Sequence, residues 1–421
     1  MQVQHRVRRI AGAAIAVAAI ATATPAASAD PTYELVSVAR HGPRTGAVRA
    51  TMSADGRLVV MASQIPLTGS ADRPGTHLYL RNRARSTTVQ VDVNSEGISA
   101  HGSNDNGVVA GRARIVAFPS QSTDLDPRFP SFSYTQVYVR DLAAGTTTLV
   151  SVSLTGTPAN GSTFVTSMSD DGRFVGMVSD ASDLVAGDTN GKADTFLLDR
   201  DTGVISRVSV TEAGAQGQDA SSTPILSPDG RSVAYFTYSP ILAGSEIARS
   251  GPAIVWVDLV SGHRERIDVS TSGAPADDQS GAMDVANRGR VVFSSYGRNL
   301  IDGHRPPGDN HLYVRDIGTG TTRLVDRMST GVPSPMGGIE PSITADGRGV
   351  WFTSYESLVP GQPPGLYRRD TTTGTTSFVD ANACHGTVSE DGSTAMFISG
   401  AQLVPTDTND DIDVYVRPGT A

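Results

Sequence analysis

Cysteine is almost absent from this chain, whose 421 residues include only Cys384. A single cysteine cannot form an intramolecular disulfide, so the stability of the protein must come from packing, with bound metal as a further source. We expect Cys384 itself to be a small buried apolar residue.

Long hydrophobic runs are also missing beyond the first 29 residues. Those residues contain a basic start with Arg6, Arg8 and Arg9, a short alanine-rich stretch and the small-residue pattern Ala27-Ser28-Ala29. This order is typical of a cleaved signal peptide, and the apolar stretch is too short to span a bilayer. We therefore expect residues 1–29 to be removed and the protein to be secreted or held in the cell envelope, without a membrane span. The sequence leaves Sec and twin-arginine export both open.

Positive charge is scarce, because 34 lysines and arginines stand against 43 aspartates and glutamates. Removing the three arginines of residues 1–29 changes the net charge from −9 to −12. Nucleic acids and anionic membranes are bound through lysine and arginine contacts to phosphate. Both classes of partner are therefore excluded.

Common catalytic signatures are missing as well. The chain has no G-x-S-x-G turn, phosphate loop, H-E-x-x-H or C-x-x-C pair. The stretch RHGPR (40–44) resembles the signature of histidine acid phosphatases, in which the histidine accepts the phosphoryl group. Those enzymes also need a distal His-Asp or His-Ala-Glu acid, and the chain has neither. We therefore expect His41 to be a loop residue.

A four-residue pattern that ends in glycine recurs seven times. The copies, which we call marker turns, are SADG (53–56), NDNG (104–107), SDDG (169–172), SPDG (227–230), ANRG (286–289), TADG (344–347) and SEDG (389–392). Asp-Gly and Asn-Gly between apolar runs are typical of β-hairpins, because glycine accepts the positive φ that such turns need.

Each marker turn is followed by three short runs rich in valine, threonine and aromatic residues, and a fourth run leads into the next marker turn. Such runs suit β-strands, and no helical periodicity occurs outside the signal peptide. Repeats of this length with four strands are typical of propeller blades. We predict an all-β fold, a seven-bladed β-propeller of four-stranded antiparallel blades over residues 30–421.

The two ends of the chain complement each other. The seventh unit stops after DVYVRPGTA (413–421), before a fourth strand, whereas YELVSVARHG (33–42) matches the fourth strand of the third unit. We predict that the N-terminal strand completes the last blade, with residues 34–39 beside residues 414–417. This closure removes two exposed sheet edges.

The repeated units resemble a known family through the stretch SPDGRSVAY (227–235). Units of this kind are similar to those of the TolB-like, WD-repeat-like β-propeller family of exported bacterial proteins. The resemblance extends over the predicted mature chain and implies the fold. It leaves the function open, because this architecture hosts scaffolds, lyases, peptidase gates and ligand binders.

Two loops carry an acidic pattern, GDTNGKAD (187–194) and TDTNDDID (406–413). Their oxygen-bearing residues share one spacing: Asp188, Asn190 and Asp194 in the first loop, and Asp407, Asn409 and Asp413 in the second. Calcium takes several oxygen ligands from a flexible loop, so we treat these six residues as candidate ligands of structural calcium. The alternative is that aspartate, asparagine and glycine are simply good turn formers.

Counting back seven residues from a marker glycine reaches the innermost strand of a blade. This count gives Arg49, Glu340 and His385 in blades 1, 6 and 7, which are neighbours in the ring, and His101 lies one position later in blade 2. We expect these side chains at the channel mouth on the loop-rich face. A basic, an acidic and an imidazole group there suit a polar ligand or a metal, and the alternative is ordinary solvated loop residues.

A full-length propeller without catalytic signatures favours an exported, non-enzymatic scaffold. We expect it to be a monomer that binds a protein or a cell-envelope or glycan ligand. The alternative is a metal-assisted polysaccharide lyase or hydrolase at the channel mouth, with a metal held near His101 and His385. Manganese or zinc held by histidine would favour the enzyme, whereas calcium held by aspartate and asparagine alone would favour the scaffold.

Overall fold

The computed structural model describes most of the chain beyond its first 32 residues, and Thr32–Ala421 forms one compact unit. The described residues are 33–38, 47–69, 73–104, 106–112, 114–244, 251–302, 306–308, 310–408 and 411–418. The predicted signal peptide and His41 lie outside these residues, and the domain boundary at residue 30 stays a prediction.

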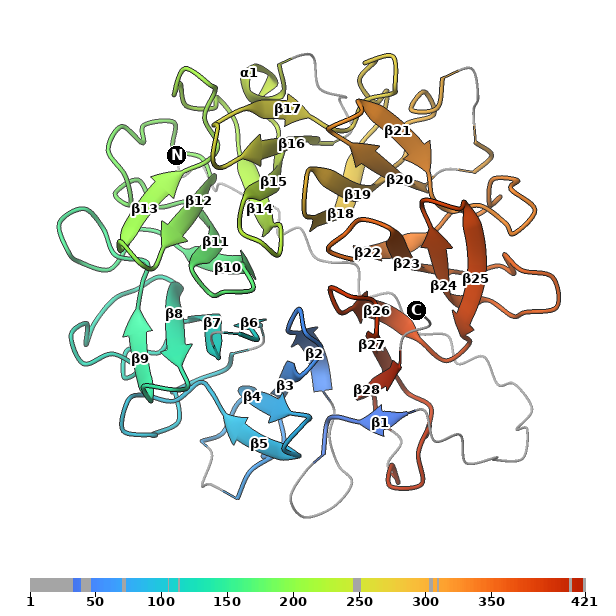
Figure 1. The fold of residues 1–421 in the computed structure, drawn as a ribbon. Coiled ribbons are helices and arrows are strands. Elements are labelled where there is room, and N and C mark those ends of the chain that lie inside the picture. Colours follow the sequence, from blue (N-terminus) through green and yellow to red (C-terminus); the bar gives the residue numbers. More distant parts are fainter. Residues whose placement is uncertain are drawn as a thin grey trace, which may run out of the picture. The chain divides into compact units, whose positions relative to one another are not determined.

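Seven four-stranded antiparallel sheets are arranged as blades around a central axis, so the predicted fold class is confirmed (Figure 1). Blade 1 contains β2 (Ala47–Met52), β3 (Leu58–Ser63), β4 (His77–Asn82) and β5 (Thr87–Gln90). Blade 2 contains β6 (Val108–Ala110), β7 (Ile115–Ser120), β8 (Gln136–Asp141) and β9 (Thr146–Leu149). Blade 3 contains β10 (Thr163–Met168), β11 (Phe174–Ser179), β12 (Asp194–Asp199) and β13 (Val204–Arg207).

The remaining blades repeat this order from the axis outward. Blade 4 contains β14 (Ser221–Leu226), β15 (Ser232–Thr237), β16 (Ala253–Asp258) and β17 (Arg264–Arg266). Blade 5 contains β18 (Ser280–Ala286), β19 (Arg290–Ser295), β20 (His311–Asp316) and β21 (Thr321–Leu324). Blade 6 contains β22 (Ile339–Ile343), β23 (Gly349–Ser354), β24 (Gly365–Asp370) and β25 (Thr375–Asp380). Blade 7 contains β26 (Cys384–Val388), β27 (Thr394–Ser399), β28 (Asp413–Pro418) and the N-terminal β1 (Glu34–Leu35).

Ring closure by the N-terminal strand is confirmed. β1 pairs antiparallel with β28, with Glu34 opposite Val416 and Leu35 opposite Tyr415. The pairing continues beyond β1, because the Ser37 hydroxyl donates a hydrogen bond of 2.5 Å to the buried carboxylate of Asp413. The last blade therefore takes three strands from the C-terminal end of the chain and one from the N-terminal end.

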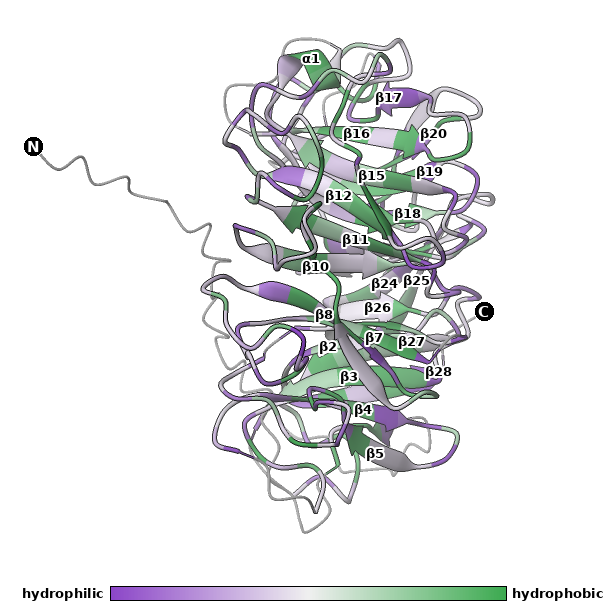
Figure 2. Cartoon of the chain, turned by 90° about the vertical axis from the view of Figure 1, so that its left-hand side faces the viewer, coloured by the Kyte–Doolittle hydropathy of each residue, from purple (hydrophilic) through white to green (hydrophobic). Residues whose placement is uncertain are grey.

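The hydrophobic core lies between blades rather than within them. Each of seven apolar clusters combines residues of two neighbouring blades, so the ring has one cluster at every interface. The stacked strands of Figure 2 accordingly carry hydrophobic residues over much of their length, and every residue of β3 and β7 is buried. Because burial of apolar surface drives folding, each blade is stabilised mainly by its neighbours.

Helix is nearly absent from the described part of the chain. Its one helix, α1 (Pro240–Ala243), lies in the connection between β15 and β16. Within the described residues, no helix has the length and apolarity needed to cross a membrane.

Six marker turns join the innermost strand of a blade to its second strand, as predicted. Their glycines have φ between 66° and 73°: Gly56, Gly172, Gly230, Gly289, Gly347 and Gly392. The assignment of NDNG (104–107) as the marker turn of blade 2 is wrong, because Gly107 precedes β6. Gly111, Arg112 and Arg114 lie in that turn instead, and Arg114 takes the left-handed φ of 55°. Without glycine at this position, the pattern does not reveal the turn.

A buried polar pair recurs between the first residue of the third strand and a side chain just beyond the outer strand. In blades 1 and 5 the pair is a histidine and an aspartate: Nδ1 of His77 lies 2.8 Å from Asp92, and Nδ1 of His311 lies 2.9 Å from Asp326. In three other blades a serine hydroxyl donates instead, and these pairs are Ser151–Gln136 (2.5 Å), Ser209–Asp194 (2.6 Å) and Ser37–Asp413 (2.5 Å). The position is polar because a buried backbone N–H of the third strand needs an acceptor there, as in Val137 N to Ser151 Oγ (3.0 Å).

Candidate functional site

β-Bulges shape the wall of the central channel. In six blades the register between the innermost and the second strand shifts by one or two residues. In blades 4 and 6 the bulge contains a non-glycine residue with left-handed φ, Thr223 (52°) and Glu340 (53°), each directly before a proline. Such backbone is strained and persists only where the surrounding structure enforces it. Bulges re-aim side chains, so this level of the channel is a candidate binding site.

Arg49, Glu340 and His385 lie on β2, β22 and β26, the innermost strands of three neighbouring blades. Glu340 and His385 fall within the bulges of their strands, and Arg49 directly follows the bulge of β2. Glu340 lines a channel cavity of 480 Å³ and Arg49 is exposed. The three positions thus share one level of the channel, and ligand binding by them stays a prediction.

His101 does not lie on an innermost strand, so its predicted placement is wrong. It precedes β6 by seven residues, and its Nε2 lies 3.3 Å from the Asp124 carboxylate in the loop after β7. Its side chain is 68% exposed, and Arg73 forms an ion pair with the same carboxylate. The error follows from the NDNG assignment, because the count began at the wrong glycine. His101 and His385 therefore belong to different parts of the ring.

The marker turns are hydrogen-bonded to one another around the axis. In four places the second residue of one marker turn donates its N–H to the carbonyl of its neighbour: Asp170 to Pro228 (2.9 Å), Asn287 to Ala345 (2.9 Å), Ala345 to Glu390 (2.9 Å) and Glu390 to Ala54 (2.7 Å). Pro228 has no N–H, and Asp229 donates to the Asn287 side chain instead (3.0 Å). The second residues of the six marker turns other than NDNG are thereby linked at this end of the channel.

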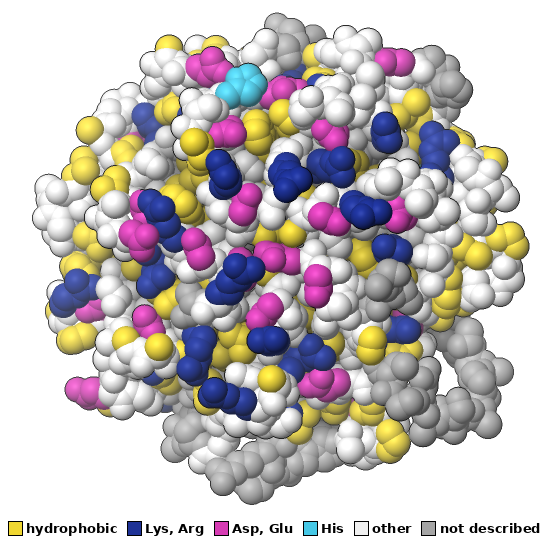
Figure 3. All heavy atoms as spheres, viewed as in Figure 1, with side chains coloured by type: hydrophobic (Ala, Val, Ile, Leu, Met, Phe, Trp, Pro, Cys, Tyr) yellow, Lys and Arg dark blue, Asp and Glu magenta, His cyan; other side chains and the backbone are white. Residues whose placement is uncertain are grey.

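Two of these linked residues, Asp170 and Glu390, are acidic and lie near one cation, Arg112. Asp170 Oδ2 forms an ion pair with Nε of Arg112 at 2.5 Å. Asp170 is 7% exposed, and its other oxygen, Oδ1, is buried with no hydrogen-bond partner among the described residues. Glu390 and Arg112 line a 250 Å³ cavity together with Asp170, Asp171 and Asp229. Figure 3 shows charged side chains of both signs gathered around the middle of the ring.

Burial and like charge raise the pKa of both carboxyls. The pKa of Asp170 is raised mainly by burial and further by Asp55 and Asp171, although Arg112 opposes the shift. The pKa of Glu390 is raised mainly by burial and then by the negative charge of Asp170. The negative charge of Asp170 raises the pKa of Glu390, so a cation bound near the two carboxylates would relieve their repulsion.

The channel beyond this ring is also acidic. Asp284 lines the 480 Å³ cavity, and burial raises its pKa although it accepts hydrogen bonds from Val285 N (2.9 Å) and Ile343 N (2.9 Å). Among the described residues that line the two cavities, six are acidic and Arg112 is the one cation. A channel with this balance of charge attracts cationic groups.

Sequence reasoning missed Asp170, Glu390 and Arg112. The available signal was the second residue of each marker turn, which is charged in SDDG, SEDG and the misassigned NDNG and uncharged in SADG, SPDG, ANRG and TADG. Arg112 occupies the corresponding turn of blade 2, where the pattern has no glycine in the expected place.

The first predicted calcium loop does bring its three residues together. The Asn190 amide donates to Asp194 (3.1 Å), and Arg207 Nη1 lies 3.4 Å from Asp188 and 3.5 Å from Asp194. Both carboxylates are buried, and burial together with Asp194 raises the pKa of Asp188 against the effect of Arg207. Arg207 is thus the cation of this loop, and calcium would have to compete with it.

In the second predicted calcium loop, Asn409 lies outside the described residues. The Tyr415 hydroxyl donates to Asp407, and Ser37 donates to Asp413. Within the described residues, no group of three or more histidine, cysteine, aspartate or glutamate side chains is placed to hold a metal ion. Calcium binding by either loop stays a prediction, and calorimetric titration of calcium into chelator-treated protein tests it.

Comparison with known proteins gives the fold. No protein-family model matches the chain, and no curated protein matches its sequence. An oligogalacturonate lyase in complex with manganese is similar in structure, with 12% identity, a TM-score of 0.53 and 90% of both chains covered. The β-propeller domain of the trilobed protease from Pyrococcus furiosus is 11% identical, with a TM-score of 0.50 over 89% of this chain and 95% of that one.

TolB from Acinetobacter baumannii is 13% identical, with a TM-score of 0.38 over 88% of this chain and 78% of that one. Identities this low indicate a shared fold alone, so membership of the TolB-like family and export stay predictions. The blade count and the closure by β1 rest on the sheets of this chain itself. The chain is a seven-bladed β-propeller with an acidic central channel.

Proposed function

We propose that the protein is an exported, non-enzymatic binding scaffold whose channel receives a cationic group of a protein or cell-envelope ligand. One observation carries this proposal. At the ring of marker turns, Asp170 pairs with Arg112 and Glu390 lines the same cavity, and Asp170 Oδ1 is buried without a hydrogen-bond partner among the described residues.

A buried acceptor without a donor is costly, so a ligand that supplies the donor gains binding free energy. An ammonium group supplies N–H donors and a positive charge. The positive charge would stabilise the ionised forms of Asp170 and Glu390, whose pKa values are raised without a ligand. The ring is held by backbone hydrogen bonds, so the two carboxylates are already in position before the ligand arrives.

Calorimetric titration with the peptide trilysine tests the proposal. The protein should bind trilysine, and Asp170→Asn and Glu390→Gln should each weaken binding about 10-fold, the usual effect of losing one charge-assisted hydrogen bond. Asp201→Asn is the matched control, because Asp201 is 70% exposed in the turn after β12 and its replacement removes the same charge.

Absence of trilysine binding, or an equal loss in Asp201→Asn, would contradict the channel as a cation site. A screen of acidic and neutral polysaccharides should yield no cleavage products. Cleavage that disappears in Glu340→Gln would instead support the lyase or hydrolase alternative.

A further inference from the structure

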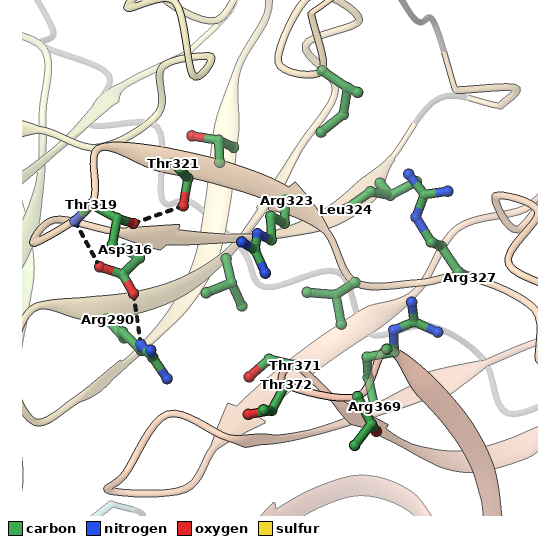
Figure 4. A pocket seen from close by; sticks show the side chains of 16 residues that line it. Arg290, Asp316, Thr319, Thr321, Arg323, Leu324, Arg327, Arg369, Thr371 and Thr372 are labelled. Atoms are coloured by element: carbon green, nitrogen blue, oxygen red, sulfur yellow. Dashed lines mark hydrogen bonds and ion pairs between the residues drawn. The ribbon is translucent and has the colours of Figure 1, made fainter.

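A second cavity, separate from the channel, lies between blades 5 and 6. It is a groove of 590 Å³ lined by β21, by the start of β19, and by the turn that follows β24 (Figure 4). The described residues that line it include four arginines and one acidic residue, Asp316. Arg290 Nε pairs with Asp316 at 2.9 Å, so Arg323, Arg327 and Arg369 remain without an acidic partner in the groove.

The repeat shows that the fold does not require arginine at position 327. Just beyond the outer strand, blades 1 to 5 each form an isolated β-bridge, and the residues in this position are Val93, Val152, Val210, Val269 and Arg327. The carbonyls of Val269 and Arg327 also accept the same hydrogen bond from the next blade, from Thr322 (2.5 Å) and Thr376 (2.6 Å). Valine occupies this position in blades 1 to 4, so the shared framework does not require arginine; Nη1 of Arg327 donates a hydrogen bond to the Gly331 carbonyl (2.8 Å).

Position 323 shows a reversal of charge. Arg323 pairs with Val314, the fourth residue of β20, and the residue with the same pairing in blade 4 is Glu265. Glu265 forms an ion pair of 2.8 Å across the interface with Arg315 of blade 5. The equivalent of Arg315 in blade 6 is Arg369. At the interface between blades 5 and 6, the position equivalent to Glu265 is therefore occupied by Arg323, whereas Arg315 at the interface between blades 4 and 5 is faced by the carboxylate of Glu265.

The groove therefore concentrates positive charge that the protein leaves uncompensated. The Arg323 side chain is exposed and forms no hydrogen bond or ion pair with any described residue. Arg369 is 9% exposed and donates to Thr376 (2.8 Å), and its pKa is lowered first by burial and then by the positive charge of Arg327. Figure 4 places Arg327 and Arg369 on one side of the groove, with Arg323 between them and Arg290.

The rest of the lining suits an oxyanion. Thr319, Thr321, Thr371 and Thr372 add hydroxyl groups beside the arginines. Guanidinium groups bind phosphate, sulfate and carboxylate in a two-pronged geometry, and hydroxyls complete the donor set. A ligand with two or more such groups would balance the three arginines.

We infer that this groove is a binding site for a multivalent oxyanion. The negative charge of this ligand would take the place of the carboxylate that Glu265 supplies in blade 4 and that Arg323 replaces in blade 5. The site is independent of the channel, which is acidic and would repel the same ligand. Its ligand carries either phosphoryl groups or several carboxylates. Both kinds of group present a pair of negatively charged oxygens that a guanidinium group can bind.

Calorimetric titration with inorganic pyrophosphate and, separately, with citrate tests this inference and distinguishes the two sources. The protein should bind at least one probe, with affinity that falls as salt is raised. Arg327→Val introduces the residue that blade 4 has at this position, and Arg323→Thr introduces the residue of blade 2, so both variants should fold. Each should weaken binding of the probe by about 10-fold.

Two further variants keep the result interpretable. Arg323→Glu restores the charge pattern of the interface between blades 4 and 5, so it should abolish binding and raise the melting temperature. Arg85→Ala removes an exposed arginine from the cavity between blades 1 and 2 and should bind like the parent protein. Absence of binding to both probes, or equal weakening in Arg85→Ala and Arg327→Val, would overturn the inference.

Discussion

The buried pair of His311 and Asp326 can be exchanged for the uncharged pair that blade 2 uses at the same place. In blade 2, Ser151 donates to Gln136, and the Gln136 amide donates to a carbonyl at 3.0 Å. In blade 5, His311 faces Asp326 through Nδ1 and the carbonyl of Pro307 through Nε2, at 2.5 Å. The double variant His311→Gln/Asp326→Ser transfers the blade 2 pair into blade 5.

Single and double variants should differ sharply in stability. His311→Gln leaves the fully buried Asp326 without its cationic partner, and breaking a buried pair in this way costs about 3–5 kcal/mol. The double variant removes both charges and keeps a hydrogen-bonded pair, so its cost should be about 1 kcal/mol or less. Urea unfolding followed by tryptophan fluorescence and circular dichroism measures both values.

The pair should also make stability depend on pH. Burial by itself lowers the pKa of His311, but the hydrogen bond and the charge of Asp326 outweigh burial and raise the pKa above 6.5. A raised folded-state pKa contributes stability that is fully present below the unfolded value and is lost as pH rises through the folded value. The parent protein should therefore lose stability relative to the double variant as pH rises above about 6.5, the unfolded pKa of histidine.

Two results would refute this reasoning. The first is a double variant as unstable as His311→Gln, which would show that the blade 2 pair does not fit blade 5. The second is a stability difference between parent and double variant that does not change with pH, which would show that His311 does not titrate differently in the folded state.

Three further predictions concern single sites. Gly203→Ala should lower the free energy of unfolding by about 1–2 kcal/mol, measured by urea titration. Gly203 has a φ of 71° and an added Cβ would contact nothing, so backbone strain is the only cost of the substitution. An unchanged unfolding midpoint would contradict this. Ser37→Ala should cost about 1–3 kcal/mol in the same assay by removing the donor to buried Asp413, and no loss would mean that the N-terminal strand contributes little to closure. Trilysine affinity should fall as pH is lowered toward 3.8 and 4.5, the usual pKa values of aspartate and glutamate. The loss should begin above these values, because the pKa values of Asp170 and Glu390 are raised. Calorimetry at several pH values measures this, and an affinity that rises as pH falls would show that the two carboxylates do not bind trilysine.

Local sequence signals predicted much of the fold. A turn glycine such as Gly230 is recognisable because only glycine adopts its φ of 66° at little cost, and short runs of β-branched residues mark the strands around it. Closure by the N-terminal strand followed from a missing strand at one end and an extra strand at the other. The prediction failed at blade 2, where Arg114 takes the left-handed conformation that glycine takes elsewhere.

The candidate sites were less predictable, because they depend on residues distant in the sequence. Asp170 and Glu390 lie 220 residues apart and line one cavity with Arg112 only because the ring brings their turns together. Arg207 beside Asp188 and Asp194 was missed for the same reason, since the pattern of one loop does not show which side chain the neighbouring strand supplies.

The sequence by itself determined the number of blades, the hairpins and the meeting of the two ends, because turn conformation and strand periodicity are properties of a few consecutive residues. Only the tertiary structure decided that the channel is acidic and that the groove between blades 5 and 6 is basic. The reason is physical: the charge of a cavity is the sum over side chains from several blades, and their proximity exists only once the ring has closed.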